Sequence, residues 1–275
     1  MAESIPNEGL GPQGDLADPS TNGASSNGTG PAAEETLRLG GMALRNGLLI
    51  HGPTSWSVAA RTASGEIEVA AGPKPNFGGN RFAGVPILRG PLRLAEAFAV
   101  IPIARRRLPS ARLPFEDARV IGAAAATTVA GALGLAPALV ALSGTDLAAY
   151  HAVEHKAIGG YEQDRDPAEV PKEHKRCGSN LIVPMVVFST AGQLAVDALV
   201  ENPGRIARSV SGLIGLSLSV EVFVHADKHP DSPLGKAIHW AGHTIQRLFA
   251  TREPTSEQMK VGVAALDAVL AAEHG

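Results

Sequence analysis

The sequence predicts an α+β membrane protein, in which a small N-terminal antiparallel β-sheet precedes a mainly α-helical bundle. Two observations lead to this class. Residues 42–71 contain short stretches of alternating apolar and polar or small side chains, separated by glycine-containing turns. Further along, three apolar segments approach or reach the length needed to cross a bilayer, namely 120–143, 181–200 and 209–224. We therefore expect about three transmembrane helices, followed by soluble C-terminal helices.

The composition excludes some classes of partner. The chain of 275 residues carries 27 acidic and 24 basic side chains, so no global charge draws it to nucleic acid. Aromatic residues make up only 4% of the chain, which is too few to form base-stacking surfaces. Cys177 is the only cysteine, so an internal disulfide is impossible and the thiol is better explained as a metal ligand or a buried group. We expect no nucleic-acid partner.

Changes in composition along the chain indicate four regions. The first is polar and lacks aromatic and basic residues almost throughout, so it cannot bury enough apolar surface to fold. Near the C-terminus, Thr255 and Gln258 have the spacing of a capping box that opens a last helix. In chain order we predict a disordered tail, a β-rich segment, a membrane-associated helical region and amphipathic C-terminal helices, with bounds 1–38, 39–91, 92–235 and 236–275.

The segment 92–104 is apolar but too short to span a bilayer, and Arg105, Arg106 and Arg107 follow it directly. Two interpretations remain open. The helix could lie at the membrane surface with its arginines among anionic headgroups, or it could pack against the rest of the protein.

The apolar segments favour insertion into the membrane over burial in a soluble core. Residues 120–143 contain no charged side chain and many small ones, which allow close packing of helices in lipid. Acidic residues inside such segments are costly and usually face a polar interior. Glu221 therefore becomes a candidate to support a functional site. We expect a multi-pass protein of the cell membrane with lipids as partners, and protein partners or a second copy of the chain as further ones.

The most specific motif is His151-Ala152-Val153-Glu154-His155. On a helix, residues four apart lie one turn above each other on the same face, so the two imidazoles can bind one ion. Glu154 lies on nearly the same face and could act as the general base. The order of residues is that of the inverted zinc-protease motif. We therefore predict a divalent metal, zinc by preference, with Glu154 as the catalytic residue.

A catalytic metal needs at least a third ligand. His174 and Cys177 have chelating spacing, and both an imidazole and a thiolate suit zinc. The predicted ligand set is therefore His151, His155, His174 and Cys177. A structural alternative is that the histidines lie at an interface and that Glu154 pairs with a neighbouring cation, either Lys156 or Arg176. His239 and His243 are also four apart, but they lack an acidic neighbour, and we assign them no metal.

Several blocks of the chain, in order, resemble the YqhQ-like family, whose members carry a domain of unknown function (DUF1385). The central blocks are Tyr150-His151 with Glu154-His155-Lys156, and His174 with Arg176-Cys177-Gly178. Others lie near residues 40–53, 88–90 and 246–258. Together they cover about residues 40–272. The resemblance implies a membrane location and a predicted metal-dependent enzyme.

The chain departs from the family pattern near its beginning. The family usually has Gln where Met42 stands, Glu where Asn46 stands and Arg where His51 stands. If that glutamate were a ligand or base, this chain could be inactive or could use His51 instead. We therefore name His51, together with Glu221, as a candidate to support the metal ligands.

These features lead to two main functional hypotheses. The first is a metal-dependent hydrolase that acts near the membrane surface on an undetermined substrate. The second is a non-enzymatic membrane scaffold in which the same residues hold a structural metal. A third hypothesis, a transporter, is supported only by the acidic residues Asp197 and Glu221 within the apolar segments.

Overall fold

The computed structural model describes residues 36–77, 85, 89–116, 118, 120–122 and 143–275. Within this part, the chain from Thr36 to Gly275 forms one unit. Nearly all of the predicted tail 1–38, and most of the predicted span 120–143, lie outside the described residues.

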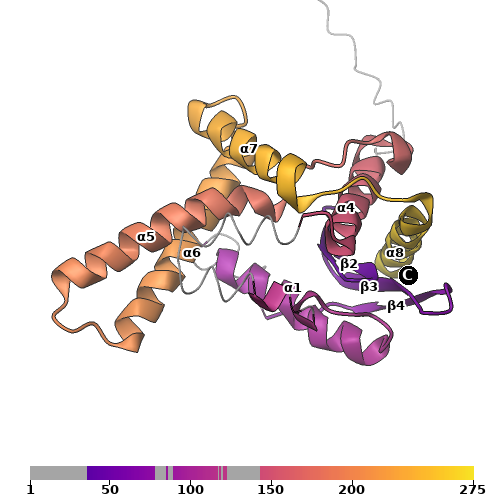
Figure 1. The fold of residues 1–275 in the computed structure, drawn as a ribbon, viewed down its shortest axis with the longest axis horizontal. Coiled ribbons are helices and arrows are strands. Elements are labelled where there is room, and N and C mark those ends of the chain that lie inside the picture. The colour runs from indigo at the N-terminus through magenta and orange to yellow at the C-terminus, as the bar shows by residue number, and fades with distance from the viewer. Residues whose placement is uncertain (1–35, 78–84, 86–88, 117, 119, 123–142) are drawn as a thin grey trace, which may run out of the picture. The chain divides into compact units, whose positions relative to one another are not determined.

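Four strands form the small antiparallel sheet that the alternating pattern predicted. They are β1 (Gly40–Ala43), β2 (Gly47–His51), β3 (Ser55–Arg61) and β4 (Ile67–Pro73). Each strand pairs with the next along the chain, in the order β1-β2-β3-β4 (Figure 1). Such a meander follows from the short turns, because two neighbouring strands need only a few residues between them to pair.

Helices cover both faces of this sheet. Leu48 and Ile50 belong to a core cluster with residues of α4 (Asp146–Gln163) and α8 (Ser256–His274). Leu49, between them, belongs to a second cluster with Val100 and Ala104 of α1 (Arg89–Arg107). Successive side chains of a strand point to opposite faces, so the consecutive apolar residues of β2 contribute to two hydrophobic clusters. Of the two interpretations of segment 92–104, the structure shows packing against the protein.

The C-terminal helix belongs to the same core as the sheet. A Cβ atom at Gly262 of α8 would lie 2.3 Å from Cγ1 of Val153 in α4, so the two helices approach closely there. The predicted capping box of Thr255 and Gln258 is present at the start of α8. The regions 39–91 and 236–275 therefore pack together, because the sheet needs apolar cover that its own segment does not supply.

Two further helices resemble membrane spans. α5 (Ile182–Leu199) and α6 (Arg205–Lys228) pair with each other, and α7 (Pro233–Ile245) follows. The span that contains α5 and the span of α6 are both long and apolar enough to cross a bilayer, with only 6% and 28% of their most apolar windows buried. Two of the three predicted apolar segments are thus long apolar helices in the described residues.

Short helical turns connect these elements. They are η1 (Pro114–Glu116), η2 (Pro167–Glu169), η3 (Gly178–Leu181) directly before α5, and a single π-helical turn, η4 (Gln246–Ala250), directly after α7. The last two contribute to the site described next.

Candidate metal centre

Helix α4 places both histidines of the predicted motif on one face. The helix begins after Thr145, whose side chain accepts a hydrogen bond from the Ala148 amide as an N-cap. The motif lies in the interior of this helix. The ring centroids of His151 and His155 are 4.4 Å apart. The two rings therefore lie on the same face of α4, tilted against each other by 59°.

Backbone carbonyls hold both rings through the same nitrogen. Nδ1 of His151 lies 2.9 Å from the Ala250 oxygen, and Nδ1 of His155 lies 2.6 Å from the Lys172 oxygen. A carbonyl accepts only, so each Nδ1 carries the hydrogen and each Nε2 keeps a lone pair. Metal-binding histidines are commonly oriented in this way.

The free nitrogen of His151 points toward a cysteine. Nε2 of His151 lies 3.2 Å from Sγ of Cys177, and Nε2 of His155 is buried without a hydrogen-bond partner. The candidate ligand atoms of these three residues all lie within 4.8 Å of one another. Tetrahedral zinc, with bonds of about 2.0–2.3 Å, places its ligand atoms about 3.3–3.8 Å apart. Small side-chain adjustments would therefore let one ion bind all three.

Burial favours the neutral forms of His155 and Cys177. It lowers the pKa of His155 well below its usual range, and the nearby His151 adds to this effect. Burial also raises the pKa of the Cys177 thiol to about 11, despite hydrogen bonding from Ser179. A neutral imidazole is the form that binds metal, whereas the thiol must lose its proton, which a bound cation promotes.

The carboxyl group of Glu154 lies next to this cluster. Burial raises its pKa, while the neighbouring His151 lowers it, and the same carboxylate acts on the thiol of Cys177. A Cβ atom at Gly41 would come within 2.8 Å of the Glu154 side chain, so β1 limits where that side chain can lie. A carboxyl group with a raised pKa can exchange protons closer to neutral pH.

The structural alternative for Glu154 is wrong. Lys156 pairs instead with Glu253 at 2.8 Å, and Arg176 pairs with Glu162. Helical geometry explains this, because Lys156 lies two residues from Glu154 and leaves the helix on another side.

His174 lies beside the three-residue cluster, with its ring centroid 5.7 Å from that of His155. Its Nε2 contacts Oε2 of Glu162 at 3.1 Å. Its backbone amide donates to Oε1 of Gln246 at 2.7 Å. Of the four predicted ligands, the structure thus brings three together and places the fourth next to them.

Gln246 is a residue that the sequence analysis did not single out for a role. It is fully buried in η4, and its Nε2 donates to the His174 carbonyl and to the Ser179 hydroxyl. It therefore holds the loop that carries Cys177. A glutamine at the end of an amphipathic helix gives no sign of this role in the sequence, and a π-helical turn is often found at functional sites.

The two supporting candidates lie in other surroundings. His51 in β2 contacts Lys74 at 3.3 Å, and burial together with that charge lowers its pKa to about 4. Glu221 lies within α6 and is partly buried. His239 contacts the Ala226 carbonyl at 3.2 Å, and His243 is exposed.

The fold and the cluster together define a class: a small sheet with helical cover, two long apolar helices and a candidate His-His-Cys metal centre. Residues 145–272 match the model of a family described as "Protein of unknown function (DUF1385)". The predicted resemblance to the YqhQ-like DUF1385 family is confirmed over these residues. The matched residues include the whole cluster.

One curated relative shows the same similarity. The chain is 30% identical over 133 residues to "Uncharacterized protein YqhQ" from Bacillus subtilis (strain 168). The match spans 45% of this chain and 40% of the length of that relative. No solved structure matches the chain significantly.

Proposed function

We propose that the protein is a membrane-associated, metal-dependent hydrolase that holds a zinc-type ion through His151, His155 and Cys177. One observation carries the proposal: two imidazoles, each fixed through Nδ1 by a backbone carbonyl, lie with Cys177 so that one ligand atom from each residue is within 4.8 Å of the others. The unpartnered, buried Nε2 of His155 fits a ligand, because a buried polar atom without a partner costs about 1–3 kcal/mol.

Three protein ligands favour catalysis over a purely structural role. Structural zinc sites use four protein ligands, whereas catalytic sites use three and leave one position open. A bound zinc ion would supply a nucleophile at neutral pH by lowering the pKa of water to roughly 7. Glu154, with its raised pKa, is the group in this chain that can take up or return the proton.

The apolar helices support a position at the membrane. Leu199 and Ile206, on α5 and α6, are 84% and 81% exposed, and exposed apolar helices of this length need an apolar partner. Cys177 directly precedes the first of these helices, with only η3 between them. We propose a multi-pass protein of the cell membrane whose site acts near the membrane surface, with lipids as partners.

The second candidate function is a membrane scaffold with a structural metal. The position of His174 favours it, because its ring lies beside that of His155 and could become a fourth ligand after leaving Glu162. This arrangement would close the coordination sphere, so that Glu154 would have no catalytic role.

Cobalt substitution distinguishes the two functions. Detergent-purified protein is loaded with Co²⁺, and its visible spectrum is recorded before and after addition of thiocyanate. A hydrolytic centre predicts one Co²⁺ per chain, a spectral change with thiocyanate, and retention of the ion in His174→Ala. An unchanged spectrum together with loss of the ion in His174→Ala would reject the hydrolase in favour of the scaffold. The exposed His243→Ala serves as the matched control.

A further inference from the structure

The short segment that follows α7 contacts the surroundings of both candidate histidine ligands. It consists of η4 and Thr251. The Ala250 carbonyl lies 2.9 Å from Nδ1 of His151. Nζ of Lys172 donates to the Thr251 carbonyl at 3.3 Å, and the carbonyl of the same lysine lies 2.6 Å from Nδ1 of His155. This one segment therefore contributes to the orientation of both imidazole rings, as residues behind metal ligands commonly do.

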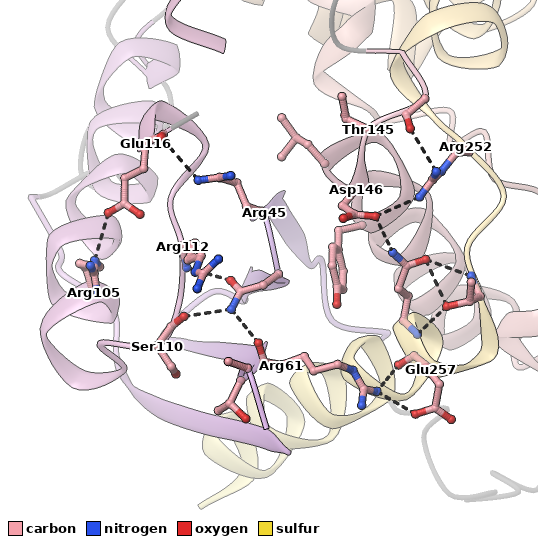
Figure 2. A pocket seen from close by; sticks show the side chains of 18 of the residues that line it. Arg45, Arg61, Arg105, Ser110, Arg112, Glu116, Thr145, Asp146, Arg252 and Glu257 are labelled. Atoms are coloured by element: carbon pink, nitrogen blue, oxygen red, sulfur yellow. Dashed lines mark hydrogen bonds and ion pairs between the residues drawn. The ribbon is translucent and has the colours of Figure 1, made fainter. Parts of the chain in front are cut away.

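The next residue, Arg252, binds this segment to the start of α4. Arg252 pairs with Asp146 at 3.0 Å (Figure 2), and its guanidinium group also donates to the Gly144 carbonyl at 3.1 Å. The backbone amide of Arg252 donates to the Ala148 carbonyl at 3.0 Å. The segment is thus held on the helix that carries both histidines, which gives its first residue a fixed position.

That first residue, Gln246, binds both main-chain polar groups of His174. The His174 amide donates to Oε1 of Gln246 at 2.7 Å, and Nε2 of Gln246 donates to the His174 carbonyl at 3.2 Å. The imidazole of His174 is held separately, since its Nε2 lies 3.1 Å from Oε2 of Glu162. These contacts keep His174 beside the three-residue cluster, with its ring centroid 5.7 Å from that of His155.

The amide group of Gln246 also acts on the other side of Cys177. Its Nε2 donates to the Ser179 hydroxyl at 2.8 Å, and the backbone amide of Ser179 donates to Sγ of Cys177 at 3.4 Å. Gln246 is fully buried, and a buried amide without partners is costly, so these hydrogen bonds fix its position. The positions of the thiol and of His174 thus depend on the same side chain.

A close contact with α7 supports the loop 174–180. A Cβ atom at Gly242, in α7, would lie 1.7 Å from Oδ1 of Asn180, so glycine is needed for the loop to approach the helix this closely. Nδ2 of Asn180 donates in turn to the Lys175 carbonyl at 2.5 Å. The loop is therefore packed against the end of α7, which lowers the entropic cost of holding a ligand in place.

We propose that Gln246 is a positioning residue that makes Cys177 the third metal ligand and keeps His174 out of the coordination sphere. This inference rests on the metal centre of the proposed function. An imidazole and a thiolate both suit zinc, so ligand chemistry alone does not decide between the two residues. The hydrogen bonds of Gln246 decide, because they hold the main chain at His174 and the thiol at Cys177. This choice leaves a coordination position open.

Cobalt titration of the full chain in detergent tests this role. The readouts are the affinity for Co²⁺ and the near-ultraviolet charge-transfer band from thiolate to cobalt, which reports the bond to Cys177 directly. Gln246→Met keeps the length of the side chain but removes its donor and its acceptor. The control Gln193→Met makes the same change in α5, where the amide bonds to Arg208. Ser179→Ala is a milder variant that removes one acceptor of Gln246.

We expect the wild type to bind one Co²⁺ with the charge-transfer band. Gln246→Met should bind it about 10–100-fold more weakly and lose most of the band, as is typical when a residue that orients metal ligands is replaced. The released His174 should then replace the thiol. Adding His174→Ala to Gln246→Met should therefore abolish binding, although His174→Ala alone retains the ion. Gln193→Met should match the wild type, and Ser179→Ala should change both readouts in the same direction by less.

A charge-transfer band and an affinity that are unchanged in Gln246→Met would overturn the positioning role and leave the metal centre intact. Absence of the band in the wild type would instead reject Cys177 as a ligand, and with it both proposals. If Gln246→Met does not fold, Ser179→Ala decides, because a band and an affinity equal to those of the wild type in that variant would also overturn the role.

Discussion

The helices on either side of Cys177 differ in what covers their apolar side chains. Val153, in α4, is fully buried against α8 and the sheet, whereas Val187, in α5, is 55% exposed. The same residue type therefore lies in two different environments. The candidate metal centre draws two ligands from α4 and one from the residue before η3 and α5. One ion would thus join the covered part of the chain to the uncovered part.

Of the changes considered, removal of the metal should lower the stability of the folded chain the most. An ion that is present at a thousandfold excess over its dissociation constant stabilises the folded state by about 4 kcal/mol. We expect a chelator to lower the stability of the wild type by about this amount, as measured by thermal unfolding in detergent.

The response to the chelator, rather than absolute stability, is compared among variants. His155→Ala should show no response, because it has lost a ligand, and the exposed His243→Ala should respond like the wild type. An equal response in His155→Ala would mean that the ion binds elsewhere.

Low pH should lower the stability of the folded chain through His51 in β2. Burial and the charge of Lys74 lower its pKa from 6.5 to about 4, so the folded state resists protonation more than the unfolded state does. Stability is therefore lost as the pH falls from 6.5 toward 4, by up to about 3 kcal/mol. His51→Gln should lose less stability over this interval in denaturant titrations. A loss as large as that of the wild type would show that His51 is not responsible.

Matched Val→Ala substitutions in α4 and α5 measure directly how well other parts of the protein cover each helix. Val153→Ala should cost about 2 kcal/mol, because it removes buried methyl groups and leaves a cavity. Val187→Ala should change stability in detergent by less than about 0.5 kcal/mol. Equal costs for the two substitutions, measured by thermal unfolding, would mean that α5 is covered by protein after all.

An effect smaller than that of Val153→Ala is expected at Asn46. Asn46→Asp keeps the acceptor for the Arg112 amide but loses both donors, to the Arg61 and Ser110 carbonyls. We expect a cost of about 1 kcal/mol, since these bonds are only partly buried. If denaturant titration shows no loss, these two hydrogen bonds of Asn46 do not contribute to stability.

The sequence predicted those features that depend on local spacing. Alternation in β3 and β4 indicated the sheet, and the interval of four residues placed His151 and His155 on one face of a helix. The capping box at Thr255 was found for the same reason, because its hydrogen bonds span three residues.

Features that depend on tertiary packing could not be predicted. Cys177 meets His151 closely because η4 and Gln246 hold its loop, and His174 turns to Glu162 instead.

X-ray absorption at the zinc edge, on protein purified in detergent and loaded with one equivalent of zinc, tests the central claim most directly. The account predicts two nitrogen ligands at about 2.0–2.1 Å and one sulfur at about 2.3 Å. The sulfur shell should disappear in Cys177→Ser. Zinc bound only through nitrogen and oxygen in the wild type, or a spectrum that is the same in Cys177→Ser, would contradict an ion shared by His151, His155 and Cys177.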